Sequence, residues 1–286
     1  MNNFCSLCPN LCAVDKNNTT GACGTNGQIK IAKYYLHQYE EPFISGAKGS
    51  GTVFFCGCSL KCVFCQNYEL SRNLRGKEVS VKRLAEIFRE LEDLGANNVN
   101  LVSPTHYSDK IIEALNIYKP KIPVVYNTHG YENLERIKLL NKYVDVYLPD
   151  IKFFSPVLSY RYCGKKDYFD KASKAIELMA EKPYKFDDKG NLIQGTLVRH
   201  LVLPQATSDS KKILDWFVKI KDKAFINLMS QYTPFGQADK YPELRRKITK
   251  REYDSVLDYA MALDIKNALF QELKSASEEY IPSWDY

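Results

Sequence analysis

From residue 52 onward, short apolar runs alternate with longer stretches that have the period of an amphipathic helix. The apolar runs, rich in Val, Ile and Leu, lie at 52–55, 98–102, 122–127, 144–152, 195–204 and 224–232. The helical patterns lie at 81–95, 109–118, 133–143, 171–181, 210–221 and 251–263. Apolar strands that alternate with amphipathic helices are typical of a parallel sheet with crossover helices. The chain is therefore predicted to be an α/β protein whose six βα units form a barrel or most of one.

Polar side chains recur at the points where these predicted strands end. They are Ser103, Thr105, His106, Asn127, Thr128, His129, Asp150, Lys152, Arg199 and His200. In a βα barrel the carboxyl ends of the strands carry the site, so we expect these groups to converge on one mouth. Because neighbouring residues of a strand point to opposite faces, His200 is expected to pack outside the barrel when Arg199 points inward.

Four of the nine cysteines follow the first predicted strand directly, at positions 56, 58, 62 and 65. Cys58, Cys62 and Cys65 have the spacing CxxxCxxC. A compact loop with this spacing can turn three thiolates onto three irons of a [4Fe–4S] cluster and leave the fourth iron without a protein ligand. Cys56 is then expected to be a buried thiol. The alternative is a zinc site that uses all four thiols, in a non-enzymatic zinc-binding interaction protein.

A second cysteine cluster lies near the start of the chain and comprises Cys5, Cys8, Cys12 and Cys23. Its CxxC pair with two further thiols fits a structural zinc site, and an auxiliary iron–sulfur cluster is equally compatible with these ligands. We expect residues 1–46 to form a Cys-rich metal-binding extension and connector. The boundary at Gly46 lies within a stretch, 37–51, that has turn formers and little helical period. Residues 47–286 are expected to form the barrel.

The stretch "CSLKCVFCQN" resembles the signature of the radical S-adenosylmethionine (SAM) superfamily, in which an aromatic residue, here Phe64, precedes the third cysteine. The strings "EEPFISGAKGSGTVFF", "SPTHY", "YNTHGYE", "VYLPDIK", "VRHLVLP" and "NLMSQYTP" resemble the pyruvate formate-lyase activating enzyme-like branch. This resemblance implies a partial (βα)6 radical SAM barrel. It also implies a [4Fe–4S] cluster whose open iron binds SAM, reductive cleavage of SAM, and a 5′-deoxyadenosyl radical that abstracts a hydrogen atom from the substrate.

The resemblance also assigns roles to single residues. "PDIK" matches the Asp-x-Lys of the activating enzymes, so Asp150 and Lys152 are assigned to the ribose and the methionine carboxylate of SAM, and Arg199 is placed near SAM. A carboxylate accepts hydrogen bonds from ribose hydroxyls and an ammonium pairs with a carboxylate, so the residue types suit these roles. Phe64 is assigned to the cofactor site by its place in the signature.

The chain departs from the pattern of the branch at two places. Many relatives have Gly-Gly-Glu after the second strand, where this chain has "VSPTHY", so Ser103 and Thr105 are assigned to the amino group of SAM. Activating enzymes also use an Asp-Thr pair to hold a monovalent cation beside SAM. Here the pair is Asn127-Thr128, and an Asn carbonyl can bind a cation but brings no charge.

Two classes of substrate fit the resemblance. The first is a protein or peptide, acted on by a glycyl-radical-enzyme activase or a related maturase that receives electrons from a flavodoxin- or ferredoxin-type donor. The second is a small molecule such as a sugar or amino acid to be epimerised. Cys163, the cysteine outside both clusters, would then be the thiol that returns a hydrogen atom to the substrate.

The composition limits partners and location. The net charge of +6 is spread over 40 basic and 34 acidic residues, so nucleic acid binding is not indicated. No apolar run approaches the roughly 20 residues that a membrane-spanning helix needs. The start "MNNFCSLCPN" lacks the features of a secretion signal, and nine cysteines without a need for disulfides favour metal or redox chemistry. We therefore expect a cytoplasmic protein.

Overall fold

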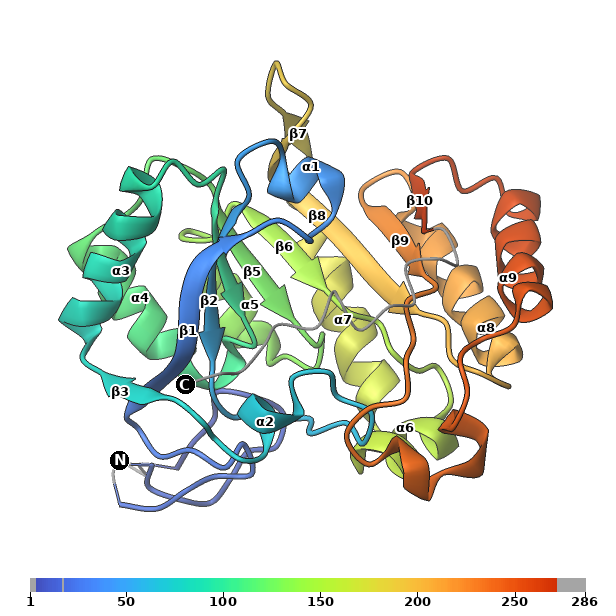
Figure 1. The fold of residues 1–286 in the computed structure, drawn as a ribbon, viewed down its shortest axis with the longest axis horizontal. Coiled ribbons are helices and arrows are strands. Elements are labelled where there is room, and N and C mark those ends of the chain that lie inside the picture. The colour runs from blue at the N-terminus through green and yellow to red at the C-terminus, as the bar shows by residue number, and fades with distance from the viewer. Residues whose placement is uncertain (1–3, 17, 272–286) are drawn as a thin grey trace.

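The computed structural model describes residues 4–16 and 18–271, and its centre is one curved sheet (Figure 1). The strand order is β10-β9-β8-β6-β5-β4-β2-β1-β3. Six strands, from β9 to β2 in this order, run parallel to one another. Strand β10 (Ala268–Phe270) adds a further parallel strand beside β9. The six are β2 (Ser50–Phe55), β4 (Val99–Val102), β5 (Val124–Thr128), β6 (Val146–Pro149), β8 (Leu192–Leu201) and β9 (Phe225–Met229). The predicted α/β class with six βα units is confirmed.

The predicted helices form with their ends shifted by a few residues. They are α3 (Val81–Asp93), α4 (Ser108–Ile117), α5 (Leu134–Leu140), α7 (Tyr168–Met179), α8 (Thr207–Phe217) and α9 (Lys250–Ala262). Helix α9 begins with a capping box, in which the side chains of Thr249 and Glu252 each bond the backbone N–H of the other residue. Helices α3 and α4 lie at one end of the curved row of strands, at the left of the view, and α8 and α9 lie at the other end, beside β9 and β10 (Figure 1).

Short elements occupy several of the connections. Helices α2 (Tyr68–Ser71) and α6 (Pro156–Cys163) lie in the loops that follow β2 and β6, and β7 (Lys185–Phe186) pairs antiparallel with β8. Helix α6 begins at Pro156, with Ser155 as its N-cap. Gly164 follows the helix as its C-cap and has a left-handed φ of 70°. None of the described helices is long and apolar enough to cross a membrane.

Strand β1 (Ile29–His37) is a part of the sheet that the sequence patterns did not predict. It pairs antiparallel with β2 along its length and with β3 (Lys77–Val79) at its start. The register with β2 shifts between Ile31 and Lys33, so the apolar alternation breaks in the middle of the strand and hides its period of two. Strand β1 belongs to the same sheet as the barrel, and the division of the chain at residue 46 stays a prediction.

The connector after β1 closes one end of the barrel. Helix α1 (Pro42–Ser45) lies near the ends at which the parallel strands begin (Figure 1). Ile44 is buried there in a cluster with apolar side chains of β5, β6 and β8: Val125, Val146, Leu148, Leu192 and Leu197. Asn98 donates a hydrogen bond of 2.7 Å to the carbonyl of Ile44. We call residues 40–45 the plug, because they fill the interior at this end and leave the opposite end for a site.

Candidate active site

A cavity of about 230 Å³ lies where the parallel strands end. Its wall includes most of the site residues predicted from the sequence: Cys58, Cys62, Phe64, Cys65, Ser103, Asn127, Asp150, Lys152 and Arg199. These residues come from the loop after β2 and from the ends of β4, β5, β6 and β8. The parallel sheet thus brings together side chains that are as much as 141 residues apart in the sequence, which is the separation from Cys58 to Arg199.

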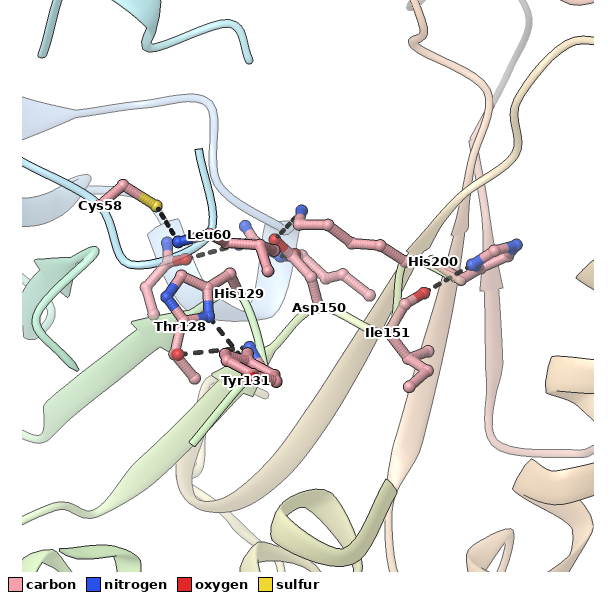
Figure 2. Close-up of polar contacts among 12 residues, drawn as sticks. Cys58, Leu60, Thr128, His129, Tyr131, Asp150, Ile151 and His200 are labelled. Carbon is pink, nitrogen blue, oxygen red and sulfur yellow. Dashed lines mark hydrogen bonds and ion pairs between the residues drawn. The ribbon is translucent and has the colours of Figure 1, made fainter. Parts of the chain in front are cut away.

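The loop after β2 presents three thiols to this cavity. Cys58 Sγ accepts hydrogen bonds from the backbone N–H groups of Leu60, at 3.4 Å, and Lys61, at 3.5 Å (Figure 2). Burial raises the pKa of Cys58 to about 12, and the neighbouring Cys65 and Cys62 add to the effect. The thiol therefore keeps its proton until a metal displaces it.

The chemistry of this donor set fits a [4Fe–4S] cluster. Three thiols face one cavity, and backbone N–H groups already point at the sulfur of Cys58, as the hydrogen bonds that tune iron–sulfur clusters do. Within residues 4–16 and 18–271, no three His, Cys, Asp or Glu side chains lie close enough together to hold a single metal ion. A cubane makes a different demand, because each of its cysteines binds a separate iron.

Across the cavity, Arg199 and Lys152 surround the carboxylate of Asp150. Arg199 Nε lies 2.9 Å from Asp150 Oδ1, and Lys152 Nζ lies 2.6 Å from Oδ2. Burial alone would raise the pKa of Asp150, but the charges of Arg199 and Lys152 outweigh it and hold the pKa below its ordinary value. Asp150 is therefore ionised at neutral pH, and the strand ends offer one anion and two cations to a ligand.

Ser103 follows β4 directly and has a strained backbone. Its φ is 58°, in the left-handed region that glycine adopts without steric cost. Its N–H donates to the carbonyl of Asn127 at 3.0 Å, which ties the ends of β4 and β5 together. A glycine would suit this position, which agrees with the Gly-Gly-Glu of the resembled relatives.

Thr105 lies behind the wall of the cavity rather than on it. Its hydroxyl donates to Glu132 Oε1 at 2.6 Å and lies 3.5 Å from His129 Nε2. His129 lines the cavity, and burial lowers its pKa to about 3, so its ring is neutral. His129 Nδ1 accepts the N–H of Tyr131 (Figure 2), which leaves the ring proton on Nε2, 2.7 Å from the hydroxyl of Ser59.

Three further sequence-based expectations concern side chains outside the cavity wall. His200 packs on the outer face of β8, as predicted: its Nδ1 lies 2.7 Å from the carbonyl of Ile151 and its ring is turned away from Asp150 (Figure 2). Cys56 is fully buried, as predicted, and its thiol donates to a backbone carbonyl at 3.0 Å. Cys163 is buried at the end of α6, where its thiol donates to the Ser159 carbonyl at 2.8 Å and lies beside Cys62.

The N-terminal cysteine segment packs against the loop that carries the three thiols. Cys58 N–H donates to the carbonyl of Cys23 at 3.1 Å, and Asn10 Nδ2 donates to the carbonyl of Ser59 at 2.9 Å. Cys8 and Cys23 are buried, whereas Cys5 and Cys12 are partly exposed. No three of these four cysteines lie close enough together in the described residues to hold a single ion, so a zinc or second iron site that gathers them on metal binding stays a prediction.

Sequence reasoning missed several residues of the site. Glu40, His37 and Tyr39 line the cavity from the end of β1 and the connector, and Glu132 lies buried behind it. The two adjacent glutamates of "EEP" were the available signal for Glu40. They come directly before a Pro that can start a helix, and if that helix is buried, the carboxylates need hydrogen-bond or charge partners inside the protein. Because strand β1 was not predicted from the sequence, the orientation of the residues that follow it could not be predicted either.

Comparison with known proteins identifies the family. The model of the radical SAM superfamily matches residues 52–217, which contain the three-cysteine loop and the strand ends from β2 to β8. The chain belongs to the radical SAM superfamily. Members of this superfamily are enzymes, and membership implies a [4Fe–4S] cluster and SAM as cofactors.

Relatives in this superfamily differ in how much of this chain they match. The protein MJ0674 of Methanocaldococcus jannaschii, itself uncharacterised, is 33% identical over 269 residues, which are 90% of this chain and 74% of that protein. The pyruvate formate-lyase-activating enzyme of Clostridium pasteurianum is 26% identical over 239 residues, which are 77% of this chain and 91% of that enzyme.

A solved structure shares the fold. Streptococcus suis SuiB, bound to its precursor peptide SuiA, superposes with a TM-score of 0.53 at 18% identity and covers 78% of this chain. The chain spans about half the length of SuiB, since the match covers 48% of that protein. The predicted radical SAM barrel is confirmed at the level of the fold.

Proposed function

We propose that this radical SAM enzyme abstracts a hydrogen atom from a protein or peptide, as a glycyl-radical-enzyme activase or a related peptide maturase. The observation that carries the proposal is the single cavity in which three thiols face the group of Asp150, Lys152 and Arg199. The relatives favour a polypeptide substrate, since one activates pyruvate formate-lyase and a structure with the same fold holds a precursor peptide.

The residues that line the cavity fall into two groups, one for the cluster and one for SAM. Cys58, Cys62 and Cys65 would hold the cluster, and the cluster with bound SAM would supply the electron and the 5′-deoxyadenosyl radical. In the second group, Asp150 accepts hydrogen bonds from ribose hydroxyls, and Lys152 offers its charge to the methionine carboxylate. Phe64 packs against Phe153, Tyr162 and Tyr232, with ring centroids about 6 Å apart. This packing holds the Phe64 ring in place beside the thiols.

Two further parts of the proposal concern the surroundings of the cluster. The N-terminal cysteines would bind zinc or a second cluster, and the metal would hold this short segment against the loop of Cys58. The electron would come from a flavodoxin- or ferredoxin-type protein.

Anaerobic reconstitution with iron and sulfide tests the proposal. The loaded protein should show the absorption and, after reduction, the paramagnetic resonance of a [4Fe–4S] cluster, and it should convert SAM to 5′-deoxyadenosine under dithionite. Replacement of Cys58, Cys62 and Cys65 by Ala should remove one cluster and all SAM cleavage. Cys56→Ala is the matched control, because this thiol lies in the same stretch but bonds a backbone carbonyl.

The substrate class needs a separate measurement. A deuterated candidate glycyl radical enzyme or peptide should transfer deuterium into 5′-deoxyadenosine. Transfer from a deuterated sugar or free amino acid would instead show that the substrate is a small molecule. A triple cysteine variant that still cleaves SAM would refute the assignment of the cluster ligands.

A further inference from the structure

Glu40, the first residue of the plug, reaches the cavity from inside the barrel. Its carboxylate Oε2 lies 3.3 Å from Arg199 Nη1, and its Oε1 accepts hydrogen bonds from Asn100 Nδ2 at 2.9 Å and Asn127 Nδ2 at 3.2 Å. Its side chain is 10% exposed. One carboxylate from the connector thus bonds residues of β4, β5 and β8.

Arg199 has a contact at each of its three guanidinium nitrogens. Nε binds Asp150, Nη1 binds Glu40, and Nη2 donates to Asn127 Oδ1 at 2.5 Å. Burial would lower the pKa of Arg199, but the nearby carboxylates, among them Asp150 and Glu40, raise it, so the guanidinium stays charged. Its long side chain is held in one orientation without any contribution from a ligand.

Glu40 also decides how the amide of Asn127 is turned. Because Asn127 Nδ2 donates to Glu40, the amide oxygen faces Arg199, where it accepts from Nη2. The reversed amide would put its oxygen against a carboxylate and its NH2 against a guanidinium, and both contacts would be lost. Glu40 therefore fixes two side chains that line the cavity.

We propose that Glu40 is a positioning residue of the SAM site, which holds Arg199 and Asn127 in place and, through Arg199, sets the orientation of Asp150. The inference rests on the proposed function, since SAM is the ligand whose ribose Asp150 would bind. It makes the connector a working part of the site: without the carboxyl group at position 40, Arg199 loses its contact at Nη1 and can turn, and the contact of Arg199 with Asp150 is weakened.

The neighbouring Glu41 provides a matched control. It has the same side chain, lies in the same plug and is 7% exposed, but its Oε1 accepts from Asn227 Nδ2 at 3.1 Å, and Asn227 lies outside the cavity wall. A loss that arises from loosening of the plug should appear in Glu41→Gln as well as in Glu40→Gln. Glu41 is near enough to act on the charge of Arg199 but makes no direct contact with it, so a loss that arises from the contact at Arg199 Nη1 should be much larger in Glu40→Gln.

The test is calorimetric titration of SAM into cluster-loaded, unreduced protein, together with iron content and thermal unfolding of each variant. We expect Glu40→Gln to weaken SAM binding roughly tenfold at unchanged iron content, and Glu41→Gln to change it by less than about twofold. In an Arg199→Ala background, Glu40→Gln should cause a clearly smaller loss, because only its contact with Asn127 is left to act on the site. Glu40→Asp keeps the carboxyl group with a shorter reach and should bind SAM better than Glu40→Gln.

Three results would overturn the inference: equal weakening by both glutamine variants, unchanged affinity in Glu40→Gln, or a full additional loss in the Arg199→Ala background. If Glu40→Gln does not fold, the comparison of Glu40→Asp with Glu41→Asp decides in the same way. Wild-type protein that binds no SAM would overturn the proposed function, whereas wild-type binding that is insensitive to Glu40 overturns only the inference.

Discussion

Asp150 and Arg199 are joined twice, once through their side chains and once through the backbone. Arg199 Nε lies 2.9 Å from Asp150 Oδ1, and the two residues also form a parallel bridge that extends the pairing of β6 with β8. The ion pair therefore starts from two backbones that are already fixed, so only the side chains lose conformational entropy when it forms. It is a rigid base for whatever the carboxylate binds.

We expect Asp150→Asn to weaken SAM binding roughly tenfold or more, because the ribose hydroxyls lose a charged acceptor and Lys152 loses its partner. Iron content should stay unchanged, since Asp150 is assigned to the cofactor and not to the cluster. Calorimetry and iron analysis check both statements. Asp170→Asn, which removes a carboxylate from an exposed ion pair on α7, is the control. If Asp150→Asn binds SAM as tightly as the wild type does, the ion pairs of Asp150 have only a structural role.

The N-terminal cysteines should bind metal independently of the central cluster. Elemental analysis of the variant without Cys58, Cys62 and Cys65 should still show about one zinc per chain, or several irons if the site is a cluster. Replacement of Cys8 and Cys23 by Ser should abolish that residual metal. Anaerobically purified protein that contains neither metal would end this proposal.

Cys163→Ala separates two roles for a thiol that lies beside Cys62. Its thiol donates to the Ser159 carbonyl and is not among the residues of the cavity wall, so we expect full product yield once a substrate is known. Product analysis alongside 5′-deoxyadenosine is the measurement. Loss of product while 5′-deoxyadenosine still forms would instead establish the hydrogen donor that an epimerase needs.

Ser103→Gly should stabilise the protein by about 1 kcal/mol, because glycine removes the steric cost of the left-handed backbone. For a chain of 286 residues the thermal midpoint should rise by roughly 2 °C. Ser103→Ala is the control, since it removes the hydroxyl but keeps the Cβ that causes the strain. A rise of the same size in both variants would trace the effect to the hydroxyl.

Glu132 should make stability fall as pH rises. Burial raises its pKa from 4.5 to about 7, so the folded protein binds this proton more tightly than the unfolded chain does. The stabilising contribution is complete below pH 4.5 and is lost as pH rises through about 7. Relative to Glu132→Gln, which stays neutral, the wild type should lose at most about 3 kcal/mol across this window.

Unfolding by denaturant at pH 4.5, 6 and 8 measures this difference in the two proteins. Thr105 and Thr128 both donate to Glu132 Oε1, and their hydroxyls can turn to serve a glutamine, so the variant should fold. A constant difference across the three pH values would show that Glu132 stays ionised in the folded protein.

The sequence predicted the parallel part of the sheet because each of its strands is buried on both faces and reads as an apolar run. Leu101 and Leu148 illustrate this, since both are fully buried on strands that carry few polar residues. It also predicted the convergence of Cys58, Asp150 and Arg199, because parallel strands finish at the same edge.

The rest depended on contacts that no local pattern carries. Strand β1 was missed because its register shift disrupts the alternation, and the buried position of Glu40 follows from a partner on a distant strand. Thr105 illustrates a finer limit: the 3₁₀ turn at Thr105–Tyr107 carries its hydroxyl behind the wall to Glu132, although its place after β4 suggested the mouth.

The plug has a consequence for the order in which the molecule is made. Glu40 leaves the ribosome 159 residues before Arg199, and Glu41 leaves it 186 residues before Asn227. Strand β1 can pair with β2 early in synthesis, and the amides of β4 and β5 can then reach Glu40, but Arg199 on β8 and the partner of Glu41 on β9 emerge much later. Until then Glu41 must remain hydrated and Glu40 has no opposite charge, so the interior of the barrel closes around the plug only after β9 has emerged.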